Sequence, residues 1–97
     1  MTVYPKLHLH LKGEYFDQIK AGAKLEEFRL RTPYWIKRIR SRTYSGIVIH
    51  RGYPAKDTFE FTILRPWRGF TEKTITHPHF GLAPVEVFAI IVNEESK

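Results

Sequence analysis

The segment Gly22 to Arg29, Gly-Ala-Lys-Leu-Glu-Glu-Phe-Arg, brings an ammonium, a carboxylate and a guanidinium close together. Successive side chains of an extended strand alternate between faces, so Glu27 and Arg29 are expected to share one face. Lys24 lies at the start of that strand, where its side chain can turn toward either face. Such a group can pair its opposite charges and still offer donors to a phosphate or a base edge. The alternative is a surface ion-pair cluster that contributes little to stability.

Chemistry at Lys24 depends on its surroundings. A lysine acts as a base or nucleophile only where burial or a second cation disfavours its charged form. The neighbouring carboxylate of Glu27 favours the charged form, and therefore electrostatic binding over proton abstraction. A ribonuclease would need one group to activate the 2′-hydroxyl, such as Glu27 or a histidine, and one to stabilise the phosphorane, such as Lys24 or Arg29.

Aromatic residues and arginines are interleaved along much of the chain. Aromatic faces stack on unpaired bases and guanidinium groups hold phosphates, so this mixture is typical of binding to single-stranded RNA or a splayed nucleoside. Most aromatics of a small domain belong to its core, and only about two are expected to reach a ligand. Trp67, between Arg65 and Arg68 in a predicted loop, is the first choice. The full set is Tyr34, Trp35, Tyr44, Tyr53, Trp67 and Phe70 with Arg31, Arg38, Arg42, Arg51, Arg65 and Arg68.

Histidines occur as His8-x-His10 and His77-x-His79, with His50 by itself. Two histidines on one strand face can share a metal, but no clear third ligand follows at a suitable spacing, so no metal and no cofactor are expected. We expect His8 and His10 on the polar face of the first strand. His77 precedes Pro78 in a predicted turn that shapes the cleft, and it is a candidate ligand contact.

The positive charge of the chain is regional. The net charge is +6, and residues 24–56 hold nine Lys or Arg against two acids, whereas the remainder holds seven bases and eight acids. A concentrated basic region attracts polyanions, which favours RNA or a nucleotide as the partner, although a solvated basic surface is the plain alternative. The absence of cysteine excludes disulfides, thiolate zinc sites and cysteine nucleophiles.

Length and pattern predict a single domain over residues 1–97. No signal sequence and no apolar run of about 20 residues is present, so we expect a cytoplasmic protein without membrane association. No feature of the sequence indicates an oligomeric state.

The elements that position these residues are short. Leu7, Leu9 and Leu11 alternate with polar residues, which predicts a strand. Phe16 and Ile19 then follow a helical spacing that ends near Gly22. Further elements are predicted as strands over Lys24 to Leu30, Gly46 to His50, Thr58 to Leu64 and Val85 to Val92, a helix over Tyr34 to Ile39 capped by Thr32 and Pro33, and a turn at Gly52-Tyr53-Pro54.

Five strands and two helices with brief connections argue against a doubly wound parallel sheet. The sequence predicts an α+β domain, a small and mostly antiparallel β-barrel with short helices at its rim.

Gly22, Lys24, Glu27 and Arg29 fit the pattern G-x-K-x-x-E-x-R, and the chain thereby resembles the ASCH superfamily. The resemblance extends to the preceding strand and helix, the later His-Pro and the closing apolar strand, which together cover nearly the whole chain. It implies a PUA-like barrel with a cleft between barrel and helix, where Lys24, Glu27 and Arg29 face RNA or a modified nucleoside. Gly22, Arg31, Trp67, Arg68 and His77 complete the predicted binding set.

The resemblance also implies two enzymatic alternatives, an amidohydrolase acting on N4-acetylcytidine and a metal-independent ribonuclease. In an enzyme, Lys24 and Glu27 would be the catalytic residues. Amidohydrolase members use a Lys, a Thr and a Glu; Lys24 matches the first, Glu27 stands in place of the Thr, and Glu72 is a loose candidate for the last. A protein-interaction module using the basic face is a third alternative.

Overall fold

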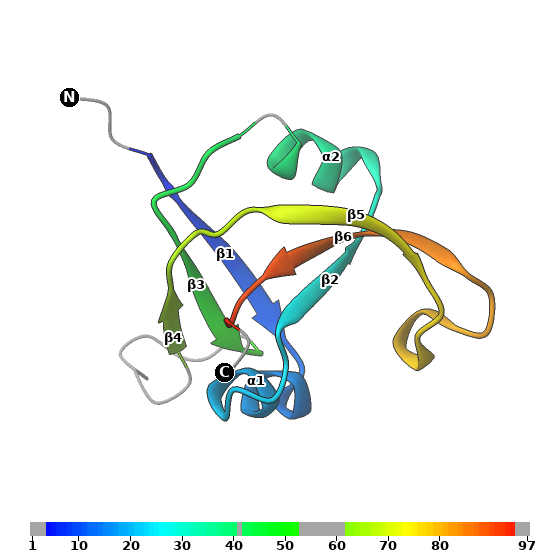
Figure 1. Cartoon of the computed structure of the whole chain (residues 1–97), viewed down its shortest axis with the longest axis horizontal. Helices are drawn as coiled ribbons and strands as arrows, with labels where there is room; N and C mark the ends of the chain where they lie inside the picture. Colours follow the sequence, from blue (N-terminus) through cyan, green and yellow to red (C-terminus); the bar gives the residue numbers. More distant parts are fainter. Residues whose placement is uncertain (1–3, 41, 53–61, 95–97) are drawn as a thin grey trace.

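The computed structural model describes residues 4–40, 42–52 and 62–94, and in these residues the chain is an α+β domain of two three-stranded sheets and two α-helices (Figure 1). The first sheet has the order β1-β3-β4 and the second the order β2-β6-β5. The strands are β1 (Lys6–Leu11), β2 (Glu26–Leu30), β3 (Gly46–Arg51), β4 (Thr62–Arg65), β5 (Phe70–Ile75) and β6 (Val85–Ile91). Among the strand pairs of the described residues, β1 and β3 are parallel and the other neighbours are antiparallel.

The first strand has the predicted alternation. Leu7, Leu9 and Leu11 are buried, whereas His8 and His10 point to the opposite, exposed side. The parallel register places His10 opposite His50 of β3. Since side chains at paired positions of neighbouring strands lie on the same face, all the histidines of this sheet gather on one side of it.

The two helices lie at opposite ends of the sheets (Figure 1). Helix α1 (Gly13–Lys20) buries Phe16 and Ile19 as its spacing predicted. Helix α2 (Pro33–Ile39) begins as predicted, because the Thr32 side chain accepts a hydrogen bond from the Trp35 amide at 3.4 Å. Neither helix is long and apolar enough to cross a membrane, and the same holds for every helix in the described residues.

One apolar core lies between the sheets. Strand β6 is the middle strand of its sheet, and its residues from Val87 to Ile90 are fully buried. The core therefore draws on both sheets and both helices, and it holds the ends of β1, β2 and α1 in fixed relation. Its members are Leu7, Leu9, Leu11, Phe16, Ile19, Ile39, Tyr44, Ile47, Ile49, Phe88, Ile90 and Val92.

Several boundaries differ from the sequence prediction. The strand expected from Lys24 begins at Glu26; before it, the Asn93 side chain donates a hydrogen bond to the Lys24 carbonyl and the Val92 amide donates one to the Leu25 carbonyl. Strand β4 is observed from Thr62 to Arg65; the earlier part of the predicted Thr58 to Leu64 strand lies outside the described residues, as does the predicted turn beyond Gly52.

The segment containing Trp67 is a loop between β4 and β5, as predicted, but strand β5 itself was not predicted. Strand β5 pairs with β6 from Phe70 to Ile75 although most of its side chains are exposed. The strands of the described residues form two separate sheets, and a closed barrel is not found among them.

Candidate functional site

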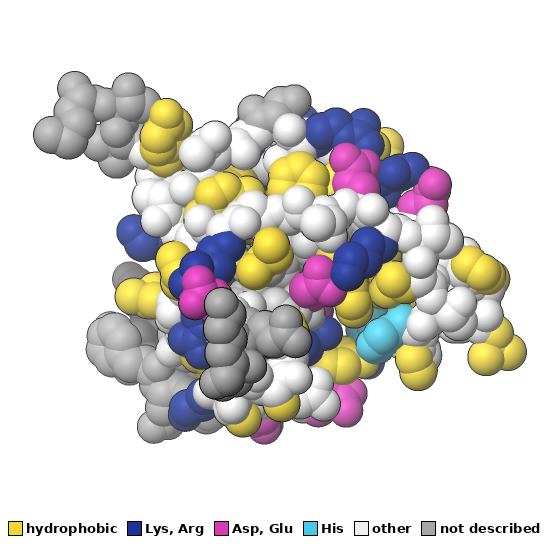
Figure 2. All heavy atoms as spheres, in the orientation of Figure 1, with side chains coloured by type: hydrophobic (Ala, Val, Ile, Leu, Met, Phe, Trp, Pro, Cys, Tyr) yellow, Lys and Arg dark blue, Asp and Glu magenta, His cyan; other side chains and the backbone are white. Residues whose placement is uncertain are grey.

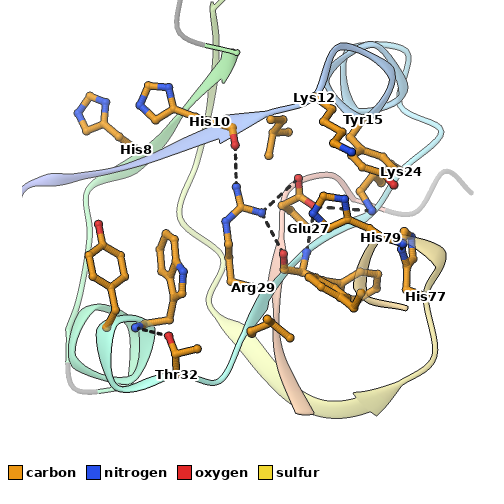
Figure 3. Close-up of a pocket in the computed structure, with 16 residues that line it drawn as sticks. His8, His10, Lys12, Tyr15, Lys24, Glu27, Arg29, Thr32, His77 and His79 are labelled. Carbon is orange, nitrogen blue, oxygen red and sulfur yellow. Dashed lines mark hydrogen bonds and ion pairs between the residues drawn. The ribbon is translucent and has the colours of Figure 1, made fainter. Parts of the chain in front are cut away.

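A cavity of about 510 Å³ opens where the end of β1, helix α1, strand β2, the start of α2 and the short helix η2 (Pro78–Phe80) meet (Figure 3). Its volume lies in the range of pockets that bind small organic ligands. The lining residues are His8, His10, Leu11, Lys12, Tyr15, Lys24, Glu27, Phe28, Arg29, Leu30, Thr32, Tyr34, Trp35, His77, His79 and Phe80.

Glu27 is the buried acid of this pocket, with 5% of its surface exposed. Its Oε1 accepts a hydrogen bond from the Phe28 amide at 3.0 Å and lies 3.9 Å from Lys24 Nζ. Its Oε2 lies 3.7 Å from Arg29 Nη1 and has no hydrogen-bond partner among the described residues. A buried polar atom without a hydrogen bond costs about 1–3 kcal/mol. Both cations neutralise the carboxylate at distances longer than a hydrogen bond.

Lys24 reaches the pocket because of how α1 ends. Gly22 has a φ of +80°, a conformation that side chains with a Cβ rarely adopt, and the amides of Ala23 and Lys24 both donate to the Gln18 carbonyl. This turn delivers the ammonium to the side that Glu27 faces. Lys24 Nζ lies 4.8 Å from the centre of the Phe28 ring and 5.4 Å from that of Tyr15. Such contacts stabilise a cation away from bulk water.

Arg29 joins the two sheets at the pocket. Its Nη2 donates to the His10 carbonyl of β1 at 3.0 Å, and its Nη1 donates to the Phe28 carbonyl at 2.9 Å. The guanidinium carbon lies 5.5 Å from the centre of the Trp35 ring. These contacts fix the plane of the guanidinium, so its position beside Glu27 is set by backbone and ring rather than by the ion pair alone.

Aromatic side chains form two walls. On the η2 side, Tyr15 lies 5.8 Å from His77 and 5.9 Å from His79 between ring centres, and Phe28 lies 6.0 Å from His77. On the α2 side, Tyr34 and Trp35 meet edge to face. Burial raises the pKa of Tyr15, and the charges of Glu14 and Glu27 raise it further, so this hydroxyl stays protonated at neutral pH.

Three histidines stack at one edge of the pocket, and two of them, His8 and His10, belong to its lining. The ring centres of His10 and His50 are 4.5 Å apart, and a ring hydrogen bond of 3.1 Å joins His8 Nδ1 to His50 Nε2. Among the described residues, no group of three or more side chains is arranged to hold a metal ion. Burial lowers the pKa of His50 below its ordinary value of 6.5, and the charges of His10 and His8 lower it further.

The shift at His50 predicts a pH dependence of stability. Because the folded chain disfavours protonated His50, the unfolded chain binds more protons as the pH falls through the ordinary pKa of about 6.5, and the free energy of unfolding is expected to fall as the pH is lowered from above this value to below it. Urea unfolding across this range measures it. A His50→Gln variant should show a flatter dependence, and an unchanged slope would contradict the prediction. Glu72, whose pKa is lowered by hydrogen bonds from Arg40 and Arg31, contributes only at more acidic pH.

The structure brings together four of the predicted site residues, Lys24, Glu27, Arg29 and His77, around this pocket. Gly22 does not line the pocket, but it forms the turn that ends α1 and leads to Lys24. The other three predicted residues, Arg31, Trp67 and Arg68, do not line the pocket.

Long-range contacts explain where those three residues lie. Arg31 is paired with Glu72 at 3.0 Å and with Glu86 at 2.6 Å, and Arg68 is paired with Glu94. Trp67 packs against the core, with its ring centre 5.1 Å from that of Tyr44. Figure 2 shows acidic side chains lying directly against basic ones on this face. The basic surface is thus partly neutralised, and the pocket is the better candidate for a ligand site.

Glu72, the loose candidate for a catalytic glutamate, does not line the pocket either. Its Oε1 accepts hydrogen bonds from Arg31 at 3.0 Å and Arg40 at 2.6 Å. Most of the other lining residues were not predicted as site residues; Tyr15 and His79 are among them, and Tyr34 and Trp35 were placed only within a larger aromatic set. The signal for Tyr15 was its position in the predicted helix directly before the Gly22 to Arg29 segment.

The pocket therefore offers a row of two cations around one carboxylate, between two aromatic walls. Comparison of the chain with family models, curated proteins and solved structures gives no match. Cationic donors suit carbonyl or phosphate oxygens, the carboxylate suits N–H donors, and the aromatic walls suit a flat ring.

Proposed function

We propose that the chain is a binding domain for single-stranded RNA or a modified nucleoside, of the ASCH type with a PUA-like fold. The observation that carries the proposal is the Glu27 carboxylate, which is buried and flanked by Lys24 and Arg29, and one of whose oxygens has no hydrogen bond from any residue that the structure describes. A group of this kind is costly in a protein interior unless a ligand completes it.

The surroundings of Glu27 support a base as that ligand. Single-stranded RNA is recognised largely by stacking unpaired bases on aromatic or guanidinium planes and by hydrogen bonds to their edges. Tyr34 and Trp35 on one side, and Tyr15 with His77 on the other, offer rings at either end of the charged row. The mostly antiparallel strands and the helices at the ends of the sheets support the PUA-like assignment.

The test is RNA affinity in a matched pair of lysine variants. Lys24→Ala should weaken binding of a fluorescently labelled random RNA octamer by about tenfold, since a hydrogen bond from a charged group is lost. Lys73→Ala removes the same charge outside the pocket, where Lys73 is paired with Glu26, and should bind nearly as the unaltered chain does. Fluorescence anisotropy at several salt concentrations measures both, and unaltered binding should weaken as salt rises. Equal affinities for the two variants would contradict the proposal.

A further inference from the structure

The three charged groups of the pocket lie in a fixed order. Glu27 sits between the other two, with one oxygen toward Lys24 and the other toward Arg29 (Figure 3). An ammonium and a guanidinium only donate hydrogen bonds, whereas an ionised carboxylate only accepts them. The pocket thus presents a donor, an acceptor and a donor in a row.

We infer, resting on the proposed function, that this row selects the imide edge of uracil. That edge presents a carbonyl oxygen (O4), an N–H (N3) and a second carbonyl oxygen (O2), which is the complement of the row formed by Lys24, Glu27 and Arg29. The central N3–H gives Glu27 Oε2 the hydrogen-bond donor that it lacks within the described part of the chain. The two carbonyls face the cations.

The other bases fit this row less well. Cytosine and adenine place a nitrogen lone pair at the middle of the edge, where it would face the carboxylate. Guanine places an N–H there, but its neighbouring amino group would point its own hydrogens at one of the cations. A buried site that pairs polar groups discriminates strongly against ligands that leave those groups unpaired. Uracil is therefore expected first, guanine second, and cytosine and adenine last.

A base can reach Glu27 Oε2 only if neighbouring side chains move, because this oxygen is hidden from water. The ion pairs of 3.9 Å and 3.7 Å are longer than hydrogen bonds, so such a shift breaks no short contact between Glu27 and its cations. The side chains of Lys24 and Arg29 are only 12% and 18% exposed, and hydrogen bonds made there are little screened by water.

The first experiment compares labelled RNA octamers of uridine, cytidine and adenosine on the full chain by fluorescence anisotropy. The uridine octamer should bind about tenfold more tightly than the other two, the discrimination expected of one well-placed base contact. Octamers of 3-methyluridine and 5-methyluridine then isolate the edge. The 3-methyluridine octamer has a methyl group in place of the N3–H, and its affinity should be about tenfold lower than that of the uridine octamer. The 5-methyluridine octamer keeps the imide, and its affinity should lie within about twofold of that of the uridine octamer.

The variant Glu27→Gln tests whether the Glu27 carboxylate is the group that selects uracil. An amide offers both a donor and an acceptor at the centre of the row, so the ratio of uridine to cytidine affinity should fall to near one. Circular dichroism checks that this variant folds, and the two methylated octamers decide the question on the unaltered chain should it not fold.

The outcomes separate this inference from the proposed function. Equal binding of all octamers, or equal binding of the two methylated ones, would overturn the uracil inference and leave RNA binding in place. Binding of no RNA at all would overturn the proposed function, and the inference with it.

Discussion

A chain that carries Lys24→Met and Arg29→Met together is expected to lose about 3 kcal/mol or more of its free energy of unfolding. The double substitution leaves the carboxylate of Glu27, 5% exposed, with neither of the cations that flank it. Methionine keeps much of the apolar stem of both side chains, so lost packing adds little. Equilibrium unfolding in urea at neutral pH measures the change.

The control adds Glu27→Gln to the same chain. The amide keeps the shape of the side chain and removes the buried charge, so the triple variant should regain most of the stability that the double variant lost. The carbonyls of His10 and Phe28 lose their Arg29 donor in both variants, so that loss cancels in the comparison. A double variant within about 0.5 kcal/mol of the unaltered chain would contradict the prediction.

The buried group of Lys24, Glu27 and Arg29 is poorly explained by a purely structural role. Buried ion pairs can often be replaced by apolar side chains of similar volume without loss of stability. Lys24, Glu27 and Arg29 form such a group, yet one carboxylate oxygen lacks a hydrogen bond among the described residues. Local features that disfavour stability tend to occur at functional sites. The free-energy cost of the unsatisfied carboxylate oxygen therefore favours a function in which a ligand donates a hydrogen bond to it.

Much of the fold was predictable from local pattern. The alternation of Leu7, Leu9 and Leu11 identifies β1 because that strand has one buried face. Thr32 and Pro33 identify the start of α2 because the cap and the first helical turn need only neighbouring residues. In the site, the alternation along β2 correctly placed Glu27 and Arg29 on one face. These features depend on contacts that are short in sequence.

The features that were missed depend on contacts between distant segments. Strand β5 is mostly exposed, and its strand conformation follows from pairing with β6 rather than from an apolar alternation of its own. Arg31 and Arg68 were candidate ligand contacts, but acids far along the chain pair with them. The local turn at Gly22 directs Lys24 toward the pocket, but the Asn93 side chain, far along the chain, also donates a hydrogen bond to the Lys24 carbonyl at 2.7 Å. No local pattern encodes these partners.

The two tryptophans separate ligand contact from packing. Trp35 lines the pocket beside Arg29, whereas Trp67 packs against Tyr44 and Phe70. Trp35→Ala should weaken binding of the uridine octamer by about 30-fold, the effect of losing one stacked base contact. Trp67→Ala should lower the free energy of unfolding by about 2–3 kcal/mol and leave the affinity of the folded chain nearly unchanged.

Both substitutions remove the same side chain, and both tryptophans are partly buried against the core, so each variant is the control for the other. Anisotropy titrations at a temperature where both variants are folded measure affinity, and urea unfolding measures stability. An equal loss of affinity in the two variants would place the ligand elsewhere on the domain. An affinity loss confined to Trp35→Ala would instead tie the ligand to the end of the pocket where Arg29 joins the two sheets, because Trp35 is the ring beside that guanidinium.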